Sequence, residues 1–204
     1  MAITAENLQD NVQLDAWLDN RLDELLPQKL ADIESSKTPS MSIIATKGSL
    51  DWAYPPFILA STAAALGWNV DMFFTFYGLL LLKRDIRTEV SPLGNPAMPM
   101  KMPFGAPWFR DIEWKMPNLV MAAVPGFENL ATKLMRETLR QKGVAPIEEL
   151  RDICIETEVR LMACQMTVDL FGWKKEDFIP EISEWAGAAT YLGVARGSDV
   201  CLYT

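Results

Sequence analysis

Short apolar runs alternate with longer amphipathic segments along most of the chain. The clearest apolar runs are typical of buried strands and cover residues 41–46, 69–76, 160–164 and 199–203. The segments between them have helical spacing of apolar residues and contain no hairpin turns. Strands that are separated by helices pair in parallel, and helices then cover both faces of the sheet. The pattern therefore predicts an α/β fold with a mostly parallel sheet of about five strands, to which 181–187 adds a shorter strand.

Helices are expected in the connections between these strands. The first is rich in alanine and leucine, and two later ones are each introduced by a proline, which is favourable only at the start of a helix. Their expected ranges are 51–66, 78–87, 125–143, 146–158 and 188–196.

The first 38 residues have a different pattern, in which apolar side chains recur at three- and four-residue steps through an acidic background. These positions are Leu8, Val12, Leu18, Leu22, Leu25 and Leu26. They predict an amphipathic helical arm over 1–38, capped by Thr4 and ended or kinked at Pro27, ahead of an α/β domain over 39–204. Eight acids and three bases make the arm strongly acidic. Two roles fit it: packing on its own domain, and contact between subunits of an oligomer.

An insertion over residues 91–126 interrupts the strand and helix pattern. It holds seven of the 13 prolines and five of the 11 methionines, together with Trp108 and Trp114. Long irregular insertions in compact domains are uncommon, and methionine-rich surfaces adapt to varied partners. Two interpretations follow: the segment folds back over the sheet, or it docks on a partner protein or makes peripheral contact with a membrane.

The overall charge narrows the classes of partner. A net charge of −8, with 19 scattered basic residues, argues against nucleic acid, because phosphate binding needs clustered lysine and arginine. Residues 1–10 show no signal-peptide pattern, and the densest apolar run, 72–82, is shorter than the roughly 20 residues that cross a bilayer. We therefore expect a cytoplasmic protein.

The chain contains no histidine, which excludes serine–histidine and cysteine–histidine catalysis and every histidine-ligated metal site. Its three cysteines form no Cys-x-x-Cys pair and cannot supply the four ligands of a thiolate zinc site. We therefore expect no metal and no cofactor. Sparse cysteines in odd number favour free thiols in a reducing compartment.

Parallel α/β sheets form their sites where strands end and helices begin. Three segments are expected to meet at that edge, namely 46–49, 75–78 and 164–167. Cys164 is the one cysteine placed there, immediately before a predicted helix start. A helix N-terminus favours the thiolate and lowers a cysteine pKa from ~8.5 toward ~7 or below.

Cys164 is therefore the candidate catalytic residue, and Lys47, Thr75, Gln165 and Thr167 are the candidate substrate-binding residues. The alternative is that Cys164 only packs, because a free cysteine often behaves as a small apolar side chain.

Cys154, on an amphipathic helix, and Cys201, in an apolar strand, are expected to be core residues.

The sequence contains three separate blocks in this order: "SIIATKGSLDWAYPPFILASTAAALGWNVDMFFTFYGLLLLKR", "VRLMACQMTVDLFGWKKEDF" and "EWAGAATYLGVARGSDVCLYT". Together they resemble the DsrE/DsrF-like family, in particular the larger DsrE-like proteins with a Pro/Met-rich insertion. The resemblance covers residues 41–204 and leaves the arm outside. It implies a flavodoxin-like three-layer sandwich that forms homo- or hetero-oligomers.

The resemblance also implies a function. The family's acceptor cysteine falls on Cys164, where it would accept sulfane sulfur or thiosulfonate and pass it to a partner thiol. The implied partners are TusA-like or rhodanese-like carriers, and the protein would be a sulfurtransferase or a stoichiometric carrier. The alternative is a non-catalytic docking module, membrane-associated or not, in a sulfur-oxidising assembly.

Overall fold

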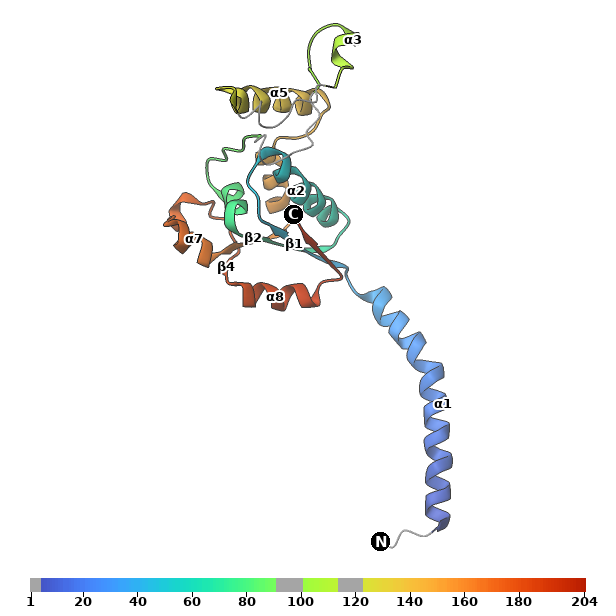
Figure 1. Cartoon of the computed structure of the whole chain (residues 1–204). Coiled ribbons are helices and arrows are strands. Elements are labelled where there is room, and N and C mark those ends of the chain that lie inside the picture. The colour runs from blue at the N-terminus through green and yellow to red at the C-terminus, as the bar shows by residue number, and fades with distance from the viewer. Residues whose placement is uncertain (1–4, 91–100, 114–122) are drawn as a thin grey trace. The chain divides into compact units, whose positions relative to one another are not determined.

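A computed structural model gives the fold of the chain and describes residues 5–90, 101–113 and 123–204 (Figure 1). The chain divides into two compact units, Met1–Thr38 and Pro39–Thr204. The first unit contains one long helix, and the second contains a sheet with helices on both faces.

Helix α1 spans Ala5–Ser36, and its side chains are described from Leu14 onward. The helix runs through Pro27, so of the two predicted outcomes, an end or a kink at this proline, the end does not occur. A proline inside a helix removes the hydrogen bond to the carbonyl four residues earlier, but the turns on both sides of Pro27 remain helical. Thr4, the expected cap, lies outside the described residues.

The second unit is built on five parallel strands in the order β4-β3-β2-β1-β5. Their bounds are β1 Ser40–Ala45, β2 Asn69–Phe74, β3 Arg160–Cys164, β4 Glu184–Ala186 and β5 Val200–Tyr203. This arrangement confirms the predicted α/β fold. Because all five strands run the same way, their carboxyl ends lie along one edge of the sheet.

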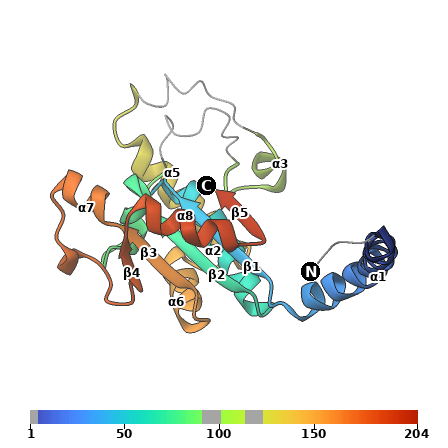
Figure 2. The ribbon, with the colours of Figure 1, turned by 90° about the horizontal axis from the view of Figure 1, so that it is seen from below.

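Helices cover both faces of this sheet. Figure 2 shows α8 crossing one face, while α2 and α6 lie on the other, where they pack on each other. The bounds are α2 Leu50–Ala65, α3 Pro107–Arg110, α5 Phe127–Gln141, α6 Ile147–Glu156, α7 Gln165–Phe171 and α8 Ala188–Gly197.

The prediction of a helix over 78–87 is wrong in both its length and its type. The segment forms a shorter 3-10 helix, η1 (Phe76–Leu82), after which Lys83 turns to an extended backbone and forms a bridge with Phe178. The run of leucines explains the length, because Leu79, Leu81 and Leu82 are all fully buried. Leucines this close in sequence are buried on several sides of the helix, and a 3-10 helix is used in short pieces.

The core lies between the sheet and the α2/α6 layer. Ile43, Met72 and Leu161 sit side by side in register on β1, β2 and β3, and none is exposed. From the helix layer, Phe57 packs on Phe74 of β2 with ring centroids 5.8 Å apart. Burial of such side chains is the main favourable term in folding, so this layer holds the strand ends in place.

The insertion over 91–126 is described only in part. The residues 91–100 and 114–122 lie outside the described residues, and the described part contains α3. Among the described helices, none is both long enough and apolar enough to cross a membrane.

Candidate functional site

Cys164 is the last residue of β3 and lies at the carboxyl edge of the sheet, as predicted. It pairs with Ala186 of β4, while the preceding Ala163 pairs with Phe74 of β2, so the thiol belongs to an inner strand with neighbours on both sides. Helix α7 begins at the next residue, Gln165. The Cys164 side chain is only 3% exposed. The site is therefore a nearly covered thiol where three strands end.

Two threonines from the predicted set meet where β2 ends and α7 begins. The hydroxyls of Thr75 and Thr167 lie 3.3 Å apart, and the backbone N–H of Phe76 donates to the Thr167 hydroxyl over 3.3 Å. Phe76 has a positive φ of 48°, which is uncommon for a bulky residue. Thr167, which is fully buried, thus links the end of β2 to the first turn of α7 and holds the strained residue.

Replacing Thr167 by alanine is expected to lower the free energy of unfolding by about 1–2 kcal/mol, because the Phe76 N–H loses its acceptor in a partly buried place. Urea denaturation followed by circular dichroism measures the change. Thr167→Ser is the matched control, since it keeps the hydroxyl and should retain most of the stability. An equal loss in both variants would show that the methyl group, and not the hydrogen bond, matters.

The other two candidates have different partners. The Lys47 ammonium lies 3.2 Å from the centre of the Trp52 ring, in a cation–π contact. The Gln165 amide donates to Asp169 on its own helix over 2.7 Å. Lys47 also follows β1, which β2 separates from β3 in the sheet. The structure thus groups Thr75 and Thr167 at the end of β3, and it holds the Lys47 and Gln165 side chains through other contacts.

An exposed apolar rim flanks the Cys164 edge, and the sequence analysis did not identify it. Its members come from η1 and α7 and are Phe76, Tyr77, Met166, Leu170 and Phe171. The Tyr77 and Phe171 rings lie 5.7 Å apart and join the two elements. The available sequence signal was a helix with more apolar residues than one buried face requires, placed directly after the candidate cysteine.

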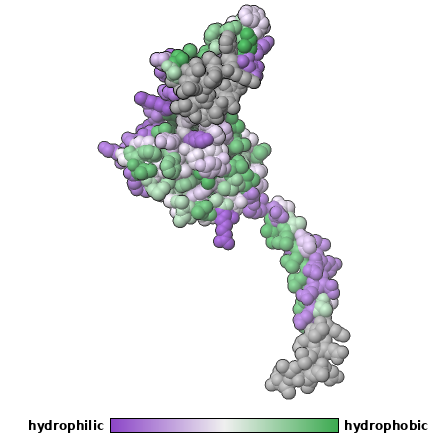
Figure 3. Space-filling view, in the orientation of Figure 1, coloured by the Kyte–Doolittle hydropathy of each residue, from purple (hydrophilic) through white to green (hydrophobic). Residues whose placement is uncertain are grey.

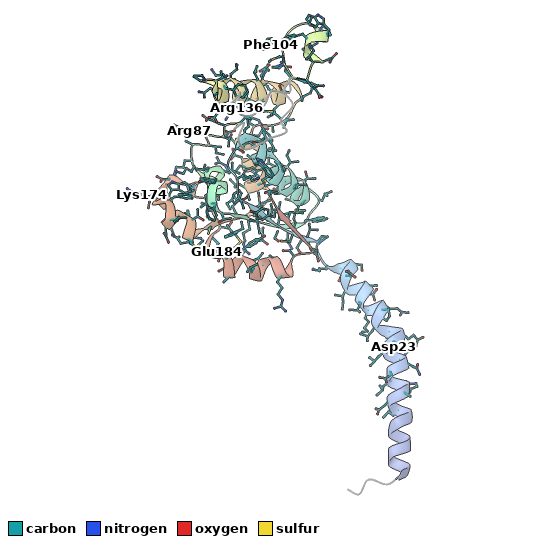
Figure 4. All side chains as sticks on the ribbon, viewed as in Figure 1. Asp23, Arg87, Phe104, Arg136, Lys174 and Glu184 are labelled. Atoms are coloured by element: carbon teal, nitrogen blue, oxygen red, sulfur yellow. The ribbon has the colours of Figure 1, made fainter. Side chains whose placement is uncertain are left out.

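Basic side chains lie over aromatic rings next to this rim. The Phe171 ring continues to Trp173 at 4.8 Å, and the ammonium of Lys83 lies 4.4 Å from the Trp173 ring centre. The ammonium of Lys175 similarly lies 4.8 Å from Trp185. Figure 4 shows the neighbouring Lys174 at the outer side of this region. The rim is therefore continuous with half-buried tryptophan rings over which two lysine ammonium groups lie.

The remaining two cysteines differ from each other. Cys154 is fully buried as predicted, and burial raises the pKa of its thiol to about 12. Cys201 is exposed, so its prediction as a core residue is wrong. Cys201 is exposed because it lies on the edge strand β5. On this face of the sheet, α8 contributes one buried side chain, Tyr191, which does not cover the cysteine. The Tyr191 hydroxyl lies 3.8 Å from the Cys201 sulfur.

These burials predict the order in which the thiols react with a maleimide in the native protein. Cys201 should be modified first, Cys164 more slowly, and Cys154 last, because a buried thiol with a raised pKa supplies almost no accessible thiolate. Timed quenching and peptide mass spectrometry measure the order. In denaturant the three should react alike. Modification of Cys154 ahead of Cys201 in the native protein would contradict the described burial.

Within the described parts of the chain, no three aspartate, glutamate or cysteine side chains gather as a metal site would require. What the arrangement offers chemically is one shielded thiol at a strand end, two hydroxyls beside its helix, and an apolar rim on the surface.

The chain as a whole is similar to known proteins. Residues 37–203 match the DsrE/DsrF/DrsH-like family, so the chain belongs to this family. It is 56% identical to the "Sulfur carrier protein DsrE2" of Allochromatium vinosum. The 163 aligned residues make up 80% of this chain and 96% of that protein.

A second relative is more distant. The "Uncharacterized protein YrkE" of Bacillus subtilis is 25% identical over 169 residues, which is 83% of this chain and 99% of that protein. Among solved structures, the crystal structure of the ychN protein from E. coli aligns with 82% of this chain and 100% of its own, at a TM-score of 0.46 and 10% identity.

Proposed function

We propose that this protein is a sulfur carrier whose Cys164 accepts sulfane sulfur and passes it to the thiol of a partner protein. The observation that carries the proposal is the position of Cys164 at the end of inner strand β3, in a family member that is 56% identical to a named sulfur carrier. The two neighbouring hydroxyls, of Thr75 and Thr167, order the loop and helix around the thiol.

The transfer consists of two thiol exchanges. The Cys164 thiolate attacks the outer sulfur of a donor persulfide, a new S–S bond forms at Cys164, and the donor leaves as its own thiolate. A partner thiolate then attacks the outer sulfur on Cys164, which leaves as a thiolate and is restored. One sulfur atom moves in each step and no net oxidation occurs. The residues therefore need to supply only an attacking and leaving thiolate.

The burial of Cys164 suits carriage. A persulfide at a 3% exposed position is protected from oxidants and from unrelated thiols between loading and delivery. The apolar rim of η1 and α7 then offers a surface on which a partner can bind next to the thiol. We propose TusA-like or rhodanese-like carriers as partners, a homo-oligomeric assembly and a cytoplasmic location, where free thiols persist.

Onward delivery tests the proposal. Wild-type protein loaded with a persulfide donor, then freed of donor by gel filtration, should transfer its extra sulfur to a purified TusA-like acceptor. Cys164→Ser should transfer none, and Cys201→Ser should transfer as much as wild type. Delivery that persists in Cys164→Ser would refute the role of this cysteine.

A second candidate function is a non-catalytic docking module, and the apolar rim favours it because an exposed patch of this kind marks interaction sites. On this alternative the 91–126 insertion would also contact a membrane or a partner. Vesicle flotation and binding to the same acceptor discriminate the two functions. If the protein is a docking module, wild type and Cys164→Ser bind the acceptor equally well and neither takes up sulfur. If it is a carrier, the Cys164→Ser variant loses sulfur delivery.

A further inference from the structure

The arm helix α1 leaves an apolar stripe exposed. Seven large side chains on it are each more than two-fifths exposed, namely Leu14, Trp17, Leu18, Leu22, Leu26, Leu30 and Ile33. Figure 3 shows apolar residues gathered along one side of this helix. Isolated helices are marginal in water, and most helices gain stability by packing their apolar face. The stripe therefore needs a partner surface.

The family match begins at residue 37, after α1 has ended at Ser36. The arm's own sequence therefore supplies the argument for what covers the stripe, through the spacing of its apolar residues and through its charges.

Six of the apolar positions are placed symmetrically about the midpoint between Asp23 and Glu24. Successive steps of three, five, three, five and three residues connect Leu14, Trp17, Leu22, Leu25, Leu30 and Ile33. Two copies of the helix can be placed antiparallel so that their midpoints between Asp23 and Glu24 lie side by side. In this register Leu14 of one copy lies opposite Ile33 of the other, and Trp17 lies opposite Leu30. These six positions are thus complementary to themselves in the antiparallel direction, whereas Leu18 and Leu26 lie opposite Lys29 and Arg21.

The charges favour the antiparallel over the parallel direction. Residues 1–20 carry four acids and no base, whereas residues 21–38 carry three bases with four acids. A parallel pair sets the acidic halves against each other, and like charges at close range repel. An antiparallel pair sets each acidic half against the half that contains the bases, which lowers the repulsion without removing it, because Asp15 then lies opposite Asp32 and Asp23 opposite Glu24.

Lys29 strengthens this choice because its position falls within the apolar stripe. In a parallel pair in register, the two Lys29 side chains would meet. In the antiparallel pair, Lys29 lies opposite Leu18 and within a turn of Asp15 and Asp19 of the other copy. A single charged residue in an apolar seam is a known means of fixing register.

We infer that α1 is a self-association element that pairs antiparallel with α1 of a second copy, with the midpoint between Asp23 and Glu24 shared. The inference does not depend on the sulfur chemistry of the second unit.

Cysteine cross-linking in the full chain tests both the pairing and its direction. Leu14→Cys and Ile33→Cys proteins are mixed in equal amounts, oxidised mildly with glutathione disulfide and digested with trypsin. Cleavage at Arg21 and Lys29 puts the two new cysteines in different peptides, which are also distinct from those of the native cysteines. Disulfides between positions 14 and 33 are expected, with at least a tenfold excess over 14–14 and 33–33 products.

Two further variants separate specific pairing from chance collision. Adding Leu22→Asp and Leu26→Asp to both proteins should abolish the 14–33 product, because it breaks the apolar stripe. Asp23→Asn is the matched control: it lies between these leucines, removes one charge (Figure 4) and should leave the product intact. Predominant 14–14 and 33–33 products would overturn the antiparallel direction. Absence of any arm cross-link, or a 14–33 product that survives the aspartate substitutions, would overturn the pairing itself.

Discussion

Replacing Gly78 by alanine is expected to lower the free energy of unfolding by about 3 kcal/mol, at the upper end of the cost of overpacking. A methyl group on Gly78 would collide with the backbone carbonyl of Ala45, the last residue of β1. Backbone cannot rotate away as a flexible side chain can, so η1 must move. Gly78 also donates its N–H to Thr75, so this shift would disturb the strand end beside Cys164.

Guanidinium denaturation of the purified variant measures this change, and Gly193→Ala is the control. Gly193 lies inside α8 with no atom within 4 Å of the added methyl group, and its φ is not positive. Alanine there should stabilise the protein by about 0.5–1 kcal/mol, because glycine is unfavourable inside a helix. Equal changes in the free energy of unfolding in the two variants would contradict the close approach of η1 to β1.

Truncating Phe74 to alanine is expected to lower the free energy of unfolding by about 3–5 kcal/mol. The side chain is fully buried between the sheet and α2, where it packs on Phe57, and its loss leaves a cavity in the layer that fixes the end of β2. Phe74→Leu retains most of the apolar volume and should cost under about 1.5 kcal/mol. Thermal unfolding of both variants measures the difference. Equal losses would argue against a tightly packed site at this position.

The sheet was predictable because its strands are short apolar runs with unambiguous period and length. Burial on both faces makes β1, β2 and β3 almost continuously apolar, and the intervening helices require parallel pairing. The same continuity misled the prediction for 78–87. The leucines from 79 to 82 fit a helix, but the tertiary burial that shortens η1 and turns Lys83 extended leaves no periodic trace in the sequence.

The position of Cys164 was predictable for a similar reason, since a strand end followed by a helix start fixes the edge on which a residue lies. Side-chain partners were not predictable. Lys47 lies over Trp52, and Gln165 bonds to Asp169, because local contacts of this kind depend on rotamers that spacing does not specify. Cys201 was mistaken for a core residue because its strand reads as apolar, although edge position and partial cover by α8 expose it.

The site of sulfur loading decides whether Cys164 is the sulfur-carrying residue. Wild type, Cys164→Ser and Cys201→Ser are incubated with a hydropersulfide donor, capped with iodoacetamide and digested with trypsin, which separates the three cysteines into peptides 152–160, 161–174 and 197–204. We expect an added sulfur atom of about 32 Da on peptide 161–174 in wild type and in Cys201→Ser. Sulfur on this peptide should be lost in Cys164→Ser, in which the exposed Cys201 is still accessible to the donor. Undiminished uptake in Cys164→Ser, with peptide 161–174 unmodified in wild type, would contradict the role of Cys164.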